Sequence, residues 1–207
     1  MLNQTLAARD LLPVRDGAQL AQRLAGHPDW VFTYDGMERA IARNADRDGQ
    51  REEYSAKKVN AFKNNTLCDN TQYLHYLSPT ESGRLHDKKV ADEYPLHLPA
   101  GSVLRQDLGL LGHRPPGVLV EMLHKKPPKG ELTFAQLLYN QLLSPLRVVI
   151  EHVHSGIKRL RMVRDKLRLR GDWFRDTVLL VACGLHNLPV RSPHRAYLTH
   201  GRANFDK

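Results

Sequence analysis

The sequence predicts an α/β domain in which helices cover a mixed sheet. Short segments rich in β-branched and aromatic residues, such as residues 30–34 and 102–106, indicate strands. From Glu131 onward, apolar residues recur at helical spacing. One predicted helix, from Ser82 or Gly83 to Tyr94, separates two groups of strands. The order of strands, one helix, more strands and then helices is typical of a sheet with helices packed against it.

The first half of the chain contributes most of the predicted strands. A short helix at residues 18–24 ends before Gly26 and Pro28. The strand at 30–34 is expected to end at Asp35-Gly36, and residues 42–52 read as a polar loop. Further short strands are expected at residues 54–62, 65–69 and 72–77.

The second half combines two strands with the main helices. The strand at 102–106 leads directly to Asp107, glycines and prolines form stiff turns between 109 and 117, and a strand follows at 118–123. Ser144-Pro145 is a cap residue followed by proline, which predicts a new helix from Pro145 to about Asp165. A last helix is expected at 172–188, before Pro189.

Composition excludes several classes of protein. With 26% charged and 41% hydrophobic residues, the 207-residue chain is neither low-complexity nor largely disordered. No apolar run approaches the roughly 20 residues that cross a bilayer. Cys68 and Cys183 lie far apart and suggest reduced core thiols in a cytosolic protein.

Basic residues are concentrated in the last third of the chain. The formal net charge is +9. Residues 1–144 hold 18 basic and 17 acidic residues, whereas residues 145–207 hold 13 and 5. Such an excess favours a polyanionic partner, most often a nucleic acid.

Two acidic residues stand where predicted strands end beside a glycine. Asp35 precedes Gly36, and Asp107 lies two residues before Gly109. An acid at the end of a strand can face a cleft, and a glycine lets a ligand or backbone approach closely. For either aspartate taken alone, an ordinary turn is the simpler explanation, because Asp and Gly are common turn residues.

A third acid, Glu151, lies within a polar stripe on the helix predicted from Pro145. The members of this stripe are Arg147, Glu151, His154, Lys158, Arg161 and Asp165. A solvated helix face, with Glu151 paired to Arg147, explains the pattern as well as a binding site does. The alternative is a metal site, because Mg²⁺ prefers carboxylate oxygens and two such ions catalyse phosphodiester chemistry. Arg147 and Lys158 would then hold DNA phosphates.

Several ordered motifs resemble the DDE-superfamily transposases of bacterial insertion sequences, in the insertion-sequence-5 and Harbinger-like branch. The matching segments are 34–36, 54–58, 82–89, 107–112, 129–133, 139–140, 147–152, 158–161 and 182–187. They include Tyr34-Asp35-Gly36, Asp107-Leu108-Gly109 and Ala182-Cys183-Gly184-Leu185-His186-Asn187. A related branch carries a tyrosine, arginine, glutamate and lysine pattern, which Arg147, Glu151 and Lys158 match, while Ser144 replaces the tyrosine.

The resemblance implies an RNase H-like catalytic domain over residues 29–190, with a short N-terminal remnant at 1–28 and a flexible tail at 191–207. It implies that Asp35, Asp107 and Glu151 bind two Mg²⁺ or Mn²⁺ ions and catalyse DNA cleavage and strand transfer at element ends. DNA would be the partner, contacted by Arg147 and Lys158 and more weakly by Lys57 and Lys58.

The resemblance also sets the expected context of the protein. Members of the family carry an N-terminal helix-turn-helix region, for which no room is expected here. A separately encoded DNA-binding half, a homo-oligomer and a bacterial cytoplasmic, nucleoid-associated location are therefore expected, with no membrane partner. Two alternatives stay open: an inactive remnant that only binds DNA, and an RNase H-like nuclease acting on another nucleic acid. Asp87 could be a fourth acid near the site, although a charge favoured by the helix dipole is the simpler interpretation.

Overall fold

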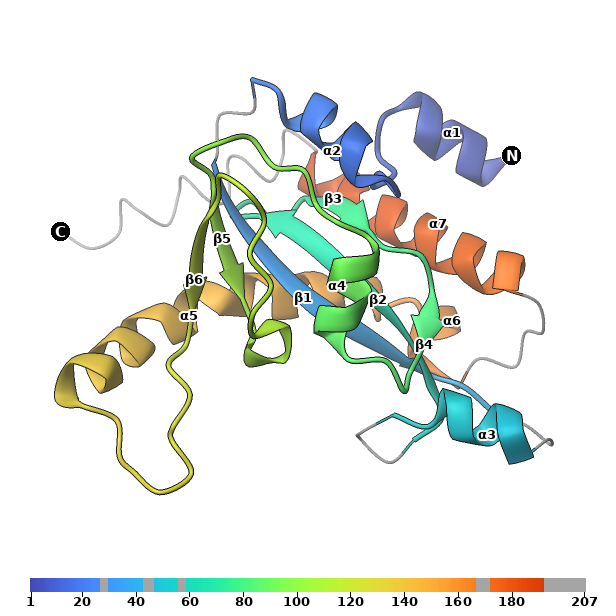
Figure 1. The fold of residues 1–207 in the computed structure, drawn as a ribbon. Coiled ribbons are helices and arrows are strands. Elements are labelled where there is room, and N and C mark those ends of the chain that lie inside the picture. The colour runs from blue at the N-terminus through green and yellow to red at the C-terminus, as the bar shows by residue number, and fades with distance from the viewer. Residues whose placement is uncertain (27–29, 43–46, 56–58, 167–171, 192–207) are drawn as a thin grey trace, which may run out of the picture.

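The computed structural model describes residues 1–26, 30–42, 47–55, 59–166 and 172–191 (Figure 1). Its strands are β1 (Val31–Ala40), β2 (Ala61–Asp69), β3 (Leu74–Leu77), β4 (Glu81–Ser82), β5 (Val103–Gln106) and β6 (Leu119–Met122). Its helices are α1 (Leu2–Ala8), α2 (Gly17–Leu24), α3 (Arg47–Glu53), α4 (Asp87–Glu93), α5 (Phe134–Ile157), α6 (Arg161–Arg164) and α7 (Asp172–Val190), with a 3-10 turn, η1, at Leu108–Leu110. Lys57 and Lys58 lie outside the described residues.

The strands form one mixed sheet in the order β3-β2-β1-β5-β6, and β4 pairs with β2. The pairs of β2 with β1 and β3 are antiparallel, whereas β1, β5 and β6 run parallel. Three antiparallel strands continued by two parallel ones form the sheet of an RNase H-like fold. The predicted α/β class and this fold are therefore confirmed.

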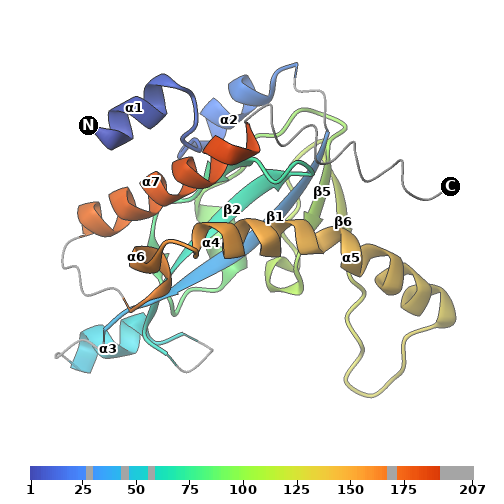
Figure 2. The same cartoon turned by 180° about the vertical axis from the view of Figure 1, so that it is seen from behind.

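Helices cover both faces of the sheet. Helices α5 and α7 cross the face that is in front in Figure 2, and α4 lies on the face that is in front in Figure 1. Side chains alternate between the two faces along each strand. Met37 and Cys68 join the apolar cluster under α5 and α7. Phe32 and Tyr34 join the cluster that includes Leu20 of α2.

Strand β1 is longer than predicted. The expected end at Asp35-Gly36 is wrong, because β1 continues to Ala40 and pairs with β2 from Phe32 to Ala40. A glycine inside a strand indicates a close approach by another group. Here that group is Asp87, which lies against Gly36. The strand expected at 54–62 is also wrong, because β2 begins only at Ala61.

Helix α5 does not begin at Pro145. It runs from Phe134, where Thr133 and Gln136 form a capping box, and contains Pro145 in its interior. The preceding hydroxyl, Ser144 Oγ, donates to the Asn140 carbonyl at 2.7 Å, as serine side chains do inside helices. The predicted continuation to Asp165 is wrong as well, because α5 ends at Ile157 and α6 is a separate turn.

The N-terminal residues pack against the same core. The predicted helix at 18–24 is confirmed as α2, and the last predicted helix is confirmed as α7. The Asn187 side chain of α7 donates to the carbonyls of Leu11 and Leu74 at 2.9 Å each. Cys68 and Cys183 are buried free thiols. None of the described helices combines the length and the apolar character that a membrane crossing requires.

Candidate active site

The sheet register places Asp35 and Asp107 side by side. Parallel strands β1 and β5 pair residue by residue, ending with Tyr34 opposite Gln106. The residues that directly follow this last pair are Asp35 and Asp107. Because Asp35 has the same parity on β1 as Met37, its side chain faces α5. The two predicted acids therefore meet at one edge of neighbouring parallel strands.

The Asp35 carboxyl lies in an environment that opposes its negative charge. Its pKa is raised to about 6, mainly by burial and also by the negative charges of Asp107 and Asp87. Two groups act in the opposite direction: the Gly36 N–H, which donates to Asp35 Oδ1 at 2.8 Å, and the positive charge of Arg147. Burial and two neighbouring carboxylates therefore both oppose the negative charge of Asp35.

Arg147 of α5 contacts the second acid directly. Its Nη2 donates to Asp107 Oδ1 at 2.7 Å, and the arginine side chain is only 15% exposed. The sequence suggested either a pair between Arg147 and Glu151 or a phosphate contact. The pair that the structure shows is with Asp107, so the guanidinium bridges α5 to the end of β5.

A second contact fixes α5 beside the first acid. Thr66 lies opposite Asp35 on β2, and its hydroxyl donates to the Asp35 carbonyl at 3.1 Å. His154 Nε2 lies 2.8 Å from the same hydroxyl oxygen. Because the hydroxyl proton is directed to Asp35, Nε2 carries the proton and donates to Thr66.

Glu151 lies between these two anchors on the helix. It follows Arg147 by four residues and precedes His154 by three, so all three share one face of α5. Arg147 is bonded to Asp107, and His154 is linked through Thr66 to Asp35. The exposed Glu151 is thus carried on the helix face that is held against both aspartates.

Asp87 supports the site from the opposite face of the sheet. A Cβ at Gly36 would lie 2.6 Å from its Cγ, and a Cβ at Gly109 would lie 2.8 Å from its Oδ2. Lys63 Nζ, 3.1 Å from Asp87 Oδ1, compensates the charge of this carboxylate. The two glycines beside the acids were the sequence signal for a close approach, but the residue that approaches comes from α4.

The remaining residues around the site differ in how visible they were in the sequence. Lys158 is the C-cap of α5, about 10 Å from Glu151 along the helix axis. Thr66 carried no signal in the sequence, because its role depends on the pairing of β1 with β2. His154 was visible as a member of the polar stripe, but its partner was not.

The carboxylate oxygens at this site suit a hard cation, but the three proposed ligands are not gathered around one point. Among the described residues, no three His, Cys, Asp or Glu side chains gather closely enough to hold a metal ion. Glu151 therefore does not complete a ligand set with Asp35 and Asp107 in this structure. The two aspartates still fit a divalent cation, because they offer carboxylate oxygens whose mutual repulsion such an ion relieves.

Comparison with known proteins agrees with this arrangement. Residues 34–187, from the residue before the first aspartate to Asn187 of α7, match the family model described as DDE superfamily endonuclease. Comparisons with curated proteins and with solved structures found no significant match. Because the family model covers most of the chain, the protein belongs to the DDE superfamily of endonucleases.

Proposed function

We propose that this protein is the catalytic core of an insertion-sequence transposase, which cleaves DNA at element ends and transfers the freed strand. Asp35, Asp107 and Glu151 are the proposed metal ligands, with Mg²⁺ or Mn²⁺ as the ion. The observation that carries the proposal is the position of Asp35 and Asp107, which directly follow the last residue pair of β1 and β5, with Glu151 between two helix contacts on the facing side of α5.

The proposed chemistry has two displacements at phosphorus. Water first attacks a phosphodiester and leaves a 3′-hydroxyl, and this hydroxyl then attacks target DNA, so one bond forms for each bond that breaks. When bound, divalent ions would activate the attacking oxygen and stabilise the leaving one. Asp35 and Asp107 supply the negative charge that retains such ions.

Arg147 is proposed to position the phosphate beside the carboxylates. Its Nη2 is bonded to Asp107, and a guanidinium has further N–H groups that can bind a phosphate oxygen. The bond to Asp107 also limits the rotamers of the arginine, so less conformational entropy is lost when DNA binds. Lys158 is a second proposed phosphate contact, and Lys57 and Lys58 are weaker candidates.

The same proposal includes the family branch, the domain limits, the partners and the location of the protein. We assign the chain to the insertion-sequence-5 and Harbinger-like branch, with a catalytic domain at 29–190 flanked by an N-terminal segment and a tail. A separately encoded DNA-binding half and a homo-oligomer that brings two element ends together are proposed partners. The nucleoid of a bacterium is the proposed location.

Nicking of supercoiled plasmid DNA in Mg²⁺ or Mn²⁺ tests the cleavage step. Wild type should nick, while Asp35→Asn and Glu151→Gln should lose at least about 100-fold in rate, as loss of an electrostatic catalytic group does. Glu131→Gln is the matched control, because Glu131 is an exposed carboxylate paired with Lys126. Equal nicking by wild type and Glu151→Gln would exclude Glu151 from the proposed ligand set.

Two further measurements separate the alternatives. If plasmid binding persists without any metal-dependent nicking, the chain is a DNA-binding remnant rather than an enzyme. If RNA–DNA hybrids are cleaved and plasmid DNA is not, the substrate class is different. Joining of a labelled element-end duplex to plasmid DNA is the product expected of strand transfer.

A further inference from the structure

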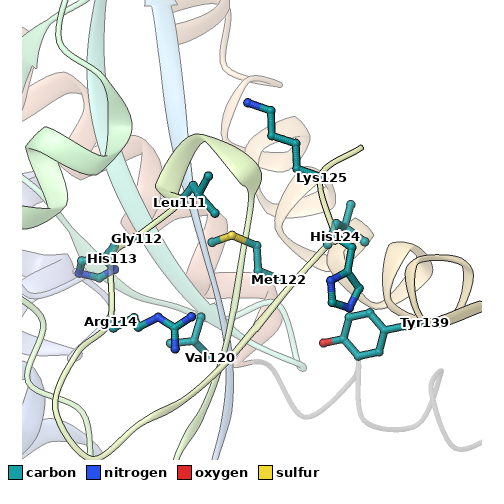
Figure 3. Close-up of a pocket in the computed structure, with 10 residues that line it drawn as sticks. Leu111, Gly112, His113, Arg114, Val120, Met122, His124, Lys125 and Tyr139 are labelled. Atoms are coloured by element: carbon teal, nitrogen blue, oxygen red, sulfur yellow. The ribbon is translucent and has the colours of Figure 1, made fainter. Parts of the chain in front are cut away.

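We propose that a cavity beside the carboxylates binds one unstacked nucleotide of the DNA strand. The cavity has a volume of about 330 Å³ and lies between the turn after η1, the end of β6 and the first half of α5 (Figure 3). This volume is at the lower end of the range for small-ligand sites, so it suits a single nucleoside rather than a duplex. The inference rests on the proposed function for its substrate, DNA.

The lining combines an apolar surface with an aromatic pair. Leu111, Val120 and Met122 contribute apolar side chains. His124 and Tyr139 close another side, with ring centroids 5.1 Å apart and planes 60° apart. Exposed aromatic rings beside an apolar surface are the chemistry that stacks nucleic-acid bases.

The backbone of His124 is hydrogen-bonded to the residue that follows Tyr139 on α5. The Asn140 side chain accepts from the His124 N–H at 2.8 Å and donates to the His124 carbonyl at 3.0 Å. These two bonds join the backbone that follows β6 to α5 next to Tyr139, so the segments that carry the two rings are held together.

Two cations stand beside the same cavity. Arg114 and Lys125 are both exposed and both line it. Among the described residues, the adjacent Lys126 pairs with Glu131, whereas neither Arg114 nor Lys125 has an acidic partner. Free cations next to stacking rings would bind the phosphates that flank a base.

The position of the cavity connects it to the candidate active site. Leu111 follows Asp107 by four residues, and Tyr139 precedes Arg147 by eight residues on the same helix. Eight helical residues span about 12 Å, a distance that a few nucleotides bridge. A strand whose phosphate lies at Asp107 and Arg147 can therefore place a nearby base in this cavity.

Fluorescence anisotropy in EDTA tests the cavity without any cleavage. The probes are a labelled oligothymidylate of about 12 nucleotides and an abasic strand of equal length and charge. Tyr139→Ala should weaken oligothymidylate binding about 5- to 150-fold, the loss of one stacked base, and should leave abasic binding unchanged. Tyr139→Phe should restore binding to near the wild-type level. Phe134→Ala, an exposed aromatic residue at the start of the same helix, is the matched control.

The outcomes separate this inference from the proposed function. An equal effect of Tyr139→Ala on both probes, or no effect on either, overturns the nucleotide site. A base-dependent loss in a protein that never nicks plasmid supports the cavity and refutes the proposed catalysis. Nicking activity with no base-dependent loss refutes the cavity alone.

Discussion

The Asp87 carboxylate lies directly behind Gly36, so that a methyl group at that glycine would sit 2.6 Å from Asp87 Cγ and Oδ1. Asp87 belongs to α4, and Gly36 follows the first proposed metal ligand on β1. The Asn65 side chain, opposite Gly36 on β2, donates to the Asp87 carbonyl at 2.8 Å. Helix α4 is thus bonded to the strand that carries Asp35, on the face away from α5.

Gly36→Ala should destabilise the protein by about 1–3 kcal/mol, the usual cost of overpacking. It should also slow nicking, because relief of the clash moves either Asp87 or the strand that carries Asp35. Denaturant unfolding and the plasmid assay measure the two effects. Gly130→Ala is the control, because its added Cβ would lie 3.6 Å from Pro127, an ordinary contact. In Gly36→Ala/Asp87→Ala, the cost should be smaller than the sum of the two single changes; strict additivity would show that the contact is not the cause.

His154→Ala should reduce nicking while costing about 1 kcal/mol of stability, since it removes the bond that fixes α5 to Thr66. Thr66→Val should have a similar effect, because it removes the hydroxyl that joins His154 to the Asp35 carbonyl. His152→Ala is the matched control, as His152 is an exposed histidine on the same helix. Equal activity of His152→Ala and His154→Ala would contradict a positioning role for His154.

Arg147→Ala should weaken DNA binding and reduce the salt dependence of that binding by about one phosphate contact. Arg161→Ala is the control, because the Arg161 side chain is 80% exposed and pairs with Asp165. This control should leave the stability of the fold close to that of wild type, because an exposed ion pair contributes little. The measurement is anisotropy of labelled duplex DNA in EDTA across a range of salt concentrations. A salt slope in Arg147→Ala equal to that of wild type would refute the phosphate contact.

Asp35→Asn should stabilise the metal-free protein at neutral pH. Because burial raises the pKa of Asp35 to about 6 from its ordinary value of 3.8, the folded state keeps a proton that the unfolded chain loses between these pH values. The contribution of the Asp35 carboxyl to the free energy of unfolding is therefore lost as the pH rises from about 4 to about 6, and it does not return at higher pH. The substitution should gain about 1–3 kcal/mol at pH 8 and almost nothing at pH 4. Urea unfolding in EDTA at several pH values measures this difference, and a gain that does not vary with pH would contradict it.

The sequence predicted the elements whose signal is local. The strand before Asp107, the strand at 118–123 and the last helix depend on short runs of apolar residues, and all three are confirmed. The helix start predicted at Ser144-Pro145 was wrong because α5 continues through Pro145. A helix can contain a proline when a nearby side chain, here that of Ser144, hydrogen-bonds a backbone carbonyl of the preceding turn. The predicted end of β1 was wrong because Gly36 makes room for Asp87 of α4. A contact with a distant helix cannot be read from the residues around Gly36.

For the candidate site, the sequence by itself determined the residue types and their spacing. Asp35, Asp107, Arg147, Glu151 and His154 are evident from strand ends and from the helical stripe. Only the tertiary structure decided which of them meet. The parallel register of β1 and β5 brings two aspartates separated by 72 positions next to each other on adjacent inner strands of the sheet. Packing of α5 then directs Arg147 to Asp107 and His154 to Thr66. Periodicity records which face of an element is polar, whereas the choice of partner depends on long-range packing that no single segment encodes.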